Sequence, residues 1–347
     1  RMDLTIGPLF RVHLVETQPD RHICVCSLHH MVTDGWSVGV LLNDLQALYD
    51  ACVLGDAESM APLPLQYKDF AAWEQQFAES AASEQMLEFW RETLGDVPAL
   101  ALPGDIAGTP TDYTRAVKRI SVGRRLAEAV GSLARRQGAT VFMAMLACLK
   151  VLLYRHTAQS DFCIGTPVSA RVQPELEPQI GPYLNILALR NRVTGEDTLT
   201  TMLQKVRATT LDAFTNQLYP FDRIVKELRL KRIPGRNPLF DVGFTLQNQN
   251  QVQVRHSSNH LHISTLSGGG QIFEDPEAAT DLWFVVTPDE NDLTMEVVYN
   301  GSRFSAGRVD RLSADLLTIL ATFVTNPDTK VKAVPLTSVV TFPAGRP

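Results

Sequence analysis

The hydrophobic positions of this chain follow two different periods, which predicts that strands and helices succeed one another along it. Phe10–Leu14 and Ile23–Leu28 are apolar runs on either side of the polar turn Gln18-Pro19-Asp20, and we expect two strands there, the second of them buried. From Ser37 to Cys52 the apolar residues lie at helical spacing, so an amphipathic helix is predicted, with Gly55 at its end.

The rest of the chain repeats this alternation on both sides of an aperiodic segment. Tyr67–Gly95 is predicted as one helix, and residues 100–113, rich in Gly, Pro, Asp and Thr, are the best candidate for a linker. Mixed elements on both sides of a linker predict an α/β protein in two parts. Beyond the linker the predicted strands are Ala116–Val122, Asp161–Pro167, Tyr183–Val193, Leu239–Leu246 and a hairpin of Leu282–Thr287 with Leu293–Tyr299, and the predicted helices are Leu126–Gln137, Thr140–His156, Thr198–Gln217 and Ser305–Asn326.

Composition excludes several classes of function. The 347 residues are 45% hydrophobic, which allows a sizeable core. A net charge of −6 leaves no basic stripe for nucleic acid, and no apolar run approaches the ~20 residues that cross a membrane. An odd number of cysteines in apolar segments, without a CxxC pair, predicts buried, reduced thiols and a cytoplasmic location; they are Cys24, Cys26, Cys52, Cys148 and Cys163.

Candidate chemistry concentrates between the second strand and the helix after it, in the string His29-His30-Met31-Val32-Thr33-Asp34-Gly35-Trp36-Ser37. Alternation along a strand sends His29 and His30 to opposite faces, so we expect one of them to face a reactive space. Gly35 would allow a close backbone approach or a positive φ, and Ser37 would cap the helix. The string suits acid–base chemistry on an acyl group.

Two other interpretations of this string stay open. A histidine at a strand end is usually structural, and Asp34 could simply cap a helix. A metal site is disfavoured, because adjacent histidines are poor co-ligands and the usual i,i+2 or i,i+4 histidine pairs are absent.

The complete set of motifs resembles the condensation domains of nonribosomal peptide synthetases. His29–Ser37 resembles the HHxxxDG signature of that family with its Trp-Ser continuation. Four further segments resemble family motifs in family order: Tyr67–Trp73 (YxDFAxW), Ile180–Arg190 (IGxFVNTLxLR), Asn216–Asp222 (HQDxPFE) and Arg236–Asp241 (the end of SRNPLFD). The chain departs from the common residues at Ile186, Asn216, Leu218 and Gly235.

The resemblance implies a fold of two chloramphenicol acetyltransferase-like lobes in a V, with a tunnel between them and the histidine motif at its middle. The lobes would be residues 1–97, carrying HHxxxDG, and 113–347, joined by a linker at 98–112. The two opening motifs of the family are absent and the chain begins with Arg1, so we expect a fragment whose first lobe is incomplete.

The implied reaction is amide formation in the biosynthesis of secondary metabolites such as antibiotics. The amine of an aminoacyl thioester on a downstream peptidyl carrier domain attacks an acyl or peptidyl thioester on an upstream one. Both substrates are carried on phosphopantetheine arms of the carriers, the domain itself binds no cofactor and no metal, and an adenylation domain is expected in the same polypeptide.

The resemblance also implies roles for individual residues. His30 would be the reactive histidine, as a base or as a positioning group, with His29 a structural neighbour. Asp34 would form an ion pair with Arg190 or Arg171, and the backbone of Gly35 would present N–H groups to an oxyanion. Asn185, Trp36 and Ser37 would line the tunnel, although Asn185 is equally well interpreted as a satisfied structural residue and Trp36 as a core residue.

Other members of the wider superfamily fit less well. An epimerization domain usually has another order of Ser and Trp after the glycine, a plant-type acyl-CoA acyltransferase carries a DFGWG motif that is absent here, and a heterocyclization domain replaces the histidines with aspartates. The intact histidines also argue against a non-catalytic binding module. Gly268-Gly269-Gly270 is interpreted as a mobile connection over the tunnel.

Overall fold

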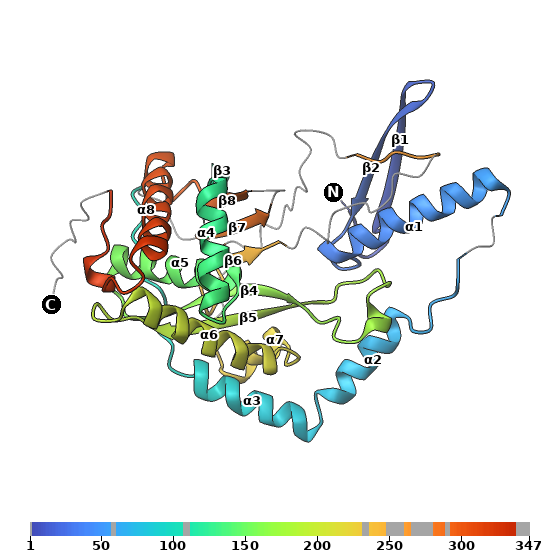
Figure 1. Cartoon of the computed structure of the whole chain (residues 1–347). Helices are drawn as coiled ribbons and strands as arrows, with labels where there is room; N and C mark the ends of the chain where they lie inside the picture. Colours follow the sequence, from blue (N-terminus) through green and yellow to red (C-terminus); the bar gives the residue numbers. More distant parts are fainter. Residues whose placement is uncertain are drawn as a thin grey trace. The chain divides into compact units, whose positions relative to one another are not determined.

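The computed structural model describes residues 2–56, 60–106, 112–230, 236–247, 260–264, 280–288 and 292–337 (Figure 1). The chain divides into two compact units. Unit 1 consists of Arg1–Glu79, Ser169–Leu184 and Gln249–Ile272, and unit 2 of Ser80–Val168, Asn185–Asn248 and Phe273–Pro347. These units differ from the division expected between residues 97 and 113, and Gly268–Gly270 lie outside the described residues.

Unit 2 is built on a six-stranded mixed sheet of order β3-β8-β7-β6-β4-β5. β8 pairs antiparallel with both β3 and β7, whereas β6 pairs parallel with β7 and β4. The predicted hairpin is confirmed in β7 and β8, where every second side chain is buried. The strands are β3 (Arg115–Ser121), β4 (Asp161–Ser169), β5 (Leu184–Arg192), β6 (Val242–Leu246), β7 (Leu282–Pro288) and β8 (Leu293–Asn300).

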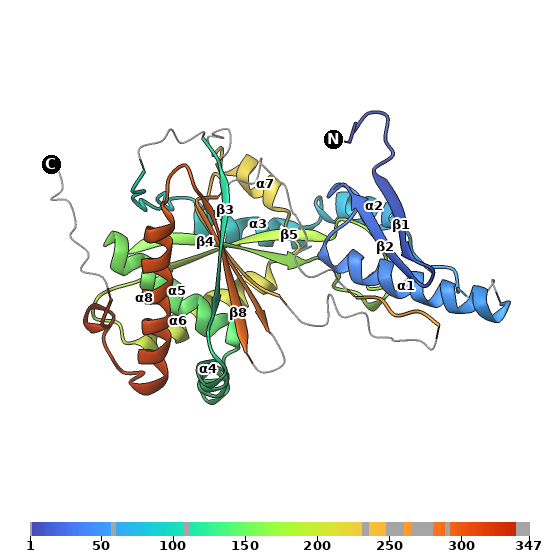
Figure 2. The same ribbon diagram turned by 90° about the horizontal axis from the view of Figure 1, so that it is seen from above.

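The main hydrophobic core lies between this sheet and its helices, with α5 at its centre. Because α5 is apolar on nearly all sides, it is buried along most of its length and packs against α4, α6 and α8 (Figure 2). The helices of unit 2 are α3 (Ala81–Leu94), α4 (Arg124–Arg136), α5 (Val141–Thr157), α6 (Leu199–Thr215), α7 (Phe221–Glu227) and α8 (Ala306–Thr325), followed by a 3₁₀ turn at Val331–Ala333.

In the described part of the chain, no single helix is long and apolar enough to span a membrane. Only α4 and α5 taken together have the length and composition of a membrane span, and the pair is bent by 104° at its junction.

Unit 1 contains the antiparallel pair β1 (Phe10–Gln18) and β2 (Arg21–Leu28), the helices α1 (Gly35–Leu54) and α2 (Tyr67–Phe77), and a 3₁₀ turn at Pro174–Leu176. The expectation that β2 is buried is wrong for the described residues, because only β1 pairs with it and most of its side chains are exposed. The apolar stripe of α1 is also partly exposed, with Leu48 at 40%.

Four other features differ from the sequence predictions. The helix expected over Tyr67–Gly95 is two helices, because Ser80 caps the start of α3 by accepting a hydrogen bond from the Ser83 N–H (3.2 Å). The predicted linker starts with Leu100 and Leu102, which are buried in the core of unit 2. The cysteines are not all buried, since Cys24, Cys26 and Cys52 are exposed. The short helix α7 was not predicted.

Lys150 is fully buried in the core of unit 2, and this burial has a testable consequence for stability. Its Nζ donates to the Leu189 carbonyl oxygen (2.7 Å), and burial lowers the pKa of Lys150 to about 7. In the unfolded chain the pKa is close to 10.4, so between these values the unfolded state binds the additional proton and the free energy of unfolding rises with pH. Below the lower value the folded protein carries a buried charge.

We therefore expect Lys150→Met to gain stability relative to the parent at about pH 6, and to lose that advantage towards about pH 9. Urea unfolding at both pH values checks this. The control is Lys205→Met, because Lys205 is partly exposed and paired with Asp197; its difference from the parent should stay constant. An equally constant difference for Lys150→Met would contradict the prediction.

Candidate functional site

Asp34 organises the corner between β2 and α1. It is the N-cap of α1, and its Oδ1 accepts hydrogen bonds from the Ser37 N–H (2.8 Å) and the Ser37 hydroxyl (2.7 Å). The Asp34 N–H donates back to Ser37 Oγ (3.4 Å), which completes a capping box. The helix therefore starts two residues earlier than expected, and Ser37 is its third residue instead of its cap.

Arg171 is the ionic partner of Asp34. One Nη contacts Oδ2 of Asp34 directly, and the other donates to Oδ1 (3.2 Å), so the pair is bidentate. The side chains of Arg171 and Asp34 are only 2% and 4% exposed. Arg190, the other arginine considered, instead pairs with Asp161 and Asp96 in unit 2.

The same corner fixes a segment that is far away in the sequence. The Tyr183 N–H donates to Asp34 Oδ2 (3.1 Å), and the Gly181 N–H donates to Ser37 Oγ (3.0 Å). The Trp36 indole N–H donates to the Glu177 carbonyl oxygen (2.8 Å). Trp36 and Ser37, which were expected along a tunnel, therefore use these polar groups to hold residues 177–183 within unit 1.

Aromatic packing supports the ion pair from one side. The guanidinium carbon of Arg171 lies 4.3 Å from the centre of the Tyr183 ring, and Tyr67 meets Tyr183 edge-on. Gly181 lies against both rings, because a Cβ there would come within 2.5 Å of Tyr67 and 2.9 Å of Tyr183. The corner is therefore rigid around Asp34 and Arg171.

The two histidines precede this rigid corner. His29 Nδ1 accepts a hydrogen bond from the Met31 N–H (3.1 Å), so the His29 ring is held by its own turn. The His29 N–H donates to the Leu9 carbonyl oxygen (2.9 Å), which ties the turn to the start of β1. His30 is exposed. Strand β2 ends at Leu28, so strand alternation does not set the directions of the two rings.

Gly35 has neither the positive φ nor the close backbone approach that its residue type suggested. Its φ is not in the left-handed region, and an added Cβ would meet nothing within 4 Å among the described residues. It is the first residue of α1. The N–H groups of a first helical turn lack intrahelical acceptors, so Gly35 and Trp36 bring backbone donors close in sequence to His30.

Asn185 has a structural role in unit 2. Its amide nitrogen donates to the carbonyl oxygens of Gln217 (2.7 Å) and Tyr219 (2.9 Å), and its Oδ1 accepts from the N–H groups of Ile186 (2.9 Å) and Phe221 (3.0 Å). Both of its donors are therefore used within the protein. Of the two interpretations, these bonds favour the satisfied structural residue over a tunnel-facing group.

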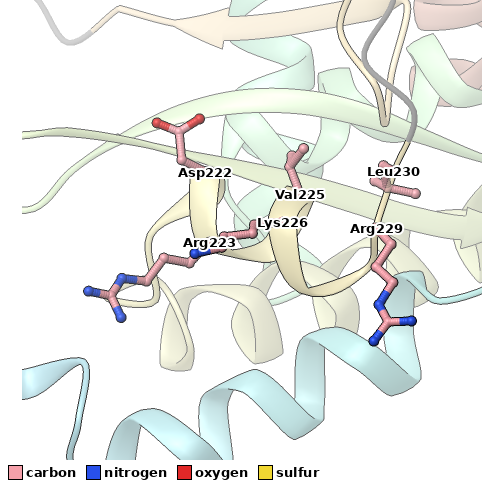
Figure 3. A pocket seen from close by; sticks show the side chains of 6 residues that line it. All are labelled: Asp222, Arg223, Val225, Lys226, Arg229 and Leu230. Atoms are coloured by element: carbon pink, nitrogen blue, oxygen red, sulfur yellow. The ribbon is translucent and has the colours of Figure 1, made fainter.

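A basic pocket lies on α7, and sequence reasoning missed it. Its volume is about 620 Å³, and it is lined by Asp222, Arg223, Val225, Lys226, Arg229 and Leu230 (Figure 3). Among the described residues, Arg223, Lys226 and Arg229 form no salt bridge, and Figure 3 shows both guanidinium groups directed away from the Asp222 carboxylate. The sequence signal was a basic run in an acidic chain: Arg223, Lys226, Arg229, Lys231, Arg232 and Arg236.

Comparison with known proteins identifies the family of this chain. The family model described as condensation domain matches residues 1–341. The chain belongs to the condensation-domain family. Tyrocidine synthase 3 of Brevibacillus parabrevis is 36% identical over 94% of this chain, and gramicidin S synthase 2 of Brevibacillus brevis is 30% identical over 97%.

The solved structures agree on the fold. The X-domain from teicoplanin biosynthesis superposes with a TM-score of 0.86 at 24% identity, over 96% of this chain and 76% of that one. This likeness supports a mixed α/β fold of the condensation-domain type. The domain spans only 5% and 7% of the two synthetases, which are far longer proteins.

Proposed function

We propose that this condensation domain forms an amide bond between two carrier-bound substrates in nonribosomal peptide synthesis. The α-amine of an aminoacyl thioester attacks the carbonyl carbon of an acyl or peptidyl thioester. The donor thiol leaves, and the nitrogen loses a proton. The observation that carries the proposal is the intact HHxxxDG corner, in which the Asp34–Arg171 ion pair holds the start of α1 beside His29 and His30.

In this proposal His30 acts on the attacking amine. A free α-amine has a pKa of about 8, and its attack creates a cationic nitrogen and an oxyanion. An imidazole at hydrogen-bond distance would accept the proton or hold the amine in line, a contribution of about 10²–10⁴-fold. The N–H groups of Gly35 and Trp36, at the start of α1, would stabilise the oxyanion.

The partners follow from this chemistry. Both substrates arrive on phosphopantetheine arms of peptidyl carrier domains, one upstream and one downstream, with an adenylation domain in the same polypeptide. We further propose two chloramphenicol acetyltransferase-like lobes in a V, residues 1–97 and 113–347, with a tunnel that brings both arms to His30. The cytoplasm is the proposed location, since the carriers and their activated amino acids are made there.

The basic pocket on α7 would receive the phosphodiester of one carrier arm. Its three cations have no ionic partner among the described residues, and on an otherwise acidic protein they suit a phosphate group. Charge reversal in the double variant Arg223→Glu/Lys226→Glu is expected to raise the KM for one loaded carrier by about tenfold and to leave kcat unchanged. Steady-state kinetics with each carrier varied in turn check this.

Arg136→Glu, an exposed arginine at the end of α4, is the control for a general charge effect. If it raises the same KM as much as the pocket variant, net charge explains the effect and the pocket does not.

The proposed function itself is tested by supplying the parent synthetase with a loaded donor carrier and one of two acceptors. One acceptor bears an aminoacyl group, and the other bears the same acyl group without its amine. We expect a longer acyl chain on the amine-bearing acceptor only. A donor whose α-carbon is inverted without transfer would indicate an epimerization domain, and binding without any new product would indicate a binding module.

A further inference from the structure

Two thiols meet on the open face of β2, outside the site described above. Cys24 Sγ and Cys26 Sγ lie 3.7 Å apart, and both residues are exposed. Residues two apart on a strand face the same way, so the pair shares one surface of the hairpin. Its cross-strand neighbours on that surface are Leu14, opposite Cys24, and Val12, opposite Cys26, which are 67% and 50% exposed.

The spacing of the sulfurs suits a bridging atom better than a disulfide. An atom with bonds of about 2.3 Å to each sulfur, the length of a Zn–S bond, could bridge the pair at this separation. A disulfide needs the sulfurs at about 2.05 Å and the Cβ atoms at about 3.8 Å. Two residues of extended strand that project the same way place their Cβ atoms about 6.6 Å apart, well beyond that separation, so β2 would have to bend to close the bond.

The neighbouring side chains decide which kind of atom fits. A structural zinc site takes four protein ligands, and the described part of the chain contains no cluster of three or more metal-ligating side chains. The fitting ligand therefore needs only two sulfurs. An aryl group attached to it would lie against Val12 and Leu14, which supply apolar surface on the same face.

We propose that Cys24 and Cys26 form a dithiol site for a soft, thiophilic electrophile of the trivalent organoarsenical type. An aryl arsenous acid condenses with the two thiols: two As–S bonds form, two As–O bonds break and two water molecules leave. Arsenic stays trivalent, so neither oxidant nor reductant is required. The second As–S bond forms within the chain, so dissociation should be at least about a hundredfold slower than from one thiol.

The surroundings of Cys26 also keep this thiol protonated at neutral pH. Partial desolvation, together with the hydrogen bond to Cys24, raises the pKa of the Cys26 thiol to about 11.

The test uses phenylarsine oxide and the intact chain, with the adduct followed by native mass spectrometry after buffer exchange. We expect one phenylarsenic group per chain, removed by 2,3-dimercaptopropanol and retained in an equal concentration of a monothiol. Cys24→Ser and Cys26→Ser should each lose retention. Cys52→Ser is the matched control, because Cys52 is exposed but lies on α1, with no thiol of the described residues in contact.

Three results would overturn the proposal. Retention in Cys24→Ser equal to the parent would show capture by a single thiol. Absence of an adduct, with Cys24 and Cys26 resistant to iodoacetamide in the native chain, would show that this face is covered. Zn²⁺ retained after dialysis by the parent but not by Cys24→Ser would assign the pair to a metal site instead.

Discussion

His30→Ala in the full synthetase is expected to lower the rate of amide formation by about 10²–10⁴-fold, with folding unchanged. The rate falls because the variant loses the imidazole that accepts the proton or orients the amine. Folding is expected to persist because His30 is exposed and follows the end of β2. Quench-flow measurement of product on the downstream carrier, combined with a thermal melt, checks both parts.

His29→Ala is the matched control for this variant. His29 accepts a hydrogen bond from the Met31 N–H within its own turn, so its loss should affect stability more than the chemical step. If product accumulates in His30→Ala at the parent rate, or if His29→Ala has the larger effect on that rate, then the assignment of the reactive histidine is wrong.

Asp34→Ala is expected to destabilise the fold by about 3–5 kcal/mol, because the substitution leaves the buried Arg171 guanidinium without its counter-charge. The substitution also removes the N-cap of α1 and the acceptor of the Tyr183 N–H, so residues 177–183 lose an anchor. Urea unfolding and the yield of folded protein measure the effect.

Glu196→Ala is the comparison for Asp34→Ala, since the salt bridges of Glu196 with Lys330 and Lys332 lie at the surface. It should unfold almost as the parent does. Equal unfolding curves for Asp34→Ala and the parent would mean that the ion pair does not hold this corner together.

Much of unit 2 could be predicted from the sequence because its signals are local. The alternation in Leu282–Thr287 and Leu293–Tyr299 is a property of neighbouring residues, and it became β7 and β8 with small changes at the ends. The all-round apolar run from Thr140 to His156 likewise gave α5, with Thr140 as its N-cap. Such patterns depend on the local period and little on the rest of the fold.

The candidate site could be predicted only in part, because its partners are distant in sequence. The string His29–Ser37 identified Asp34, but two arginines fitted the ion pair equally well. The choice of Arg171 depends on a contact between residues 137 positions apart, which brings Ser169–Leu184 into unit 1. No spacing rule within one strand or helix contains that information.

Asn185 shows a related limit of the sequence. From the sequence it could equally be a tunnel-lining or a satisfied structural residue, and the structure shows that its amide bonds to the segment around Tyr219 and Phe221. Those partners follow α6, and a sequence does not reveal which backbone groups at a helix end still lack acceptors or donors.

The central claim is that this domain transfers a donor acyl group to an acceptor amine. Its most direct test is a single turnover of the parent synthetase with both carriers loaded, followed by the intact mass of each carrier. The account predicts that the downstream carrier gains the mass of the donor acyl group while the upstream carrier loses it at the same rate. An unchanged downstream carrier, with the donor retained or released as the free acid, would contradict it.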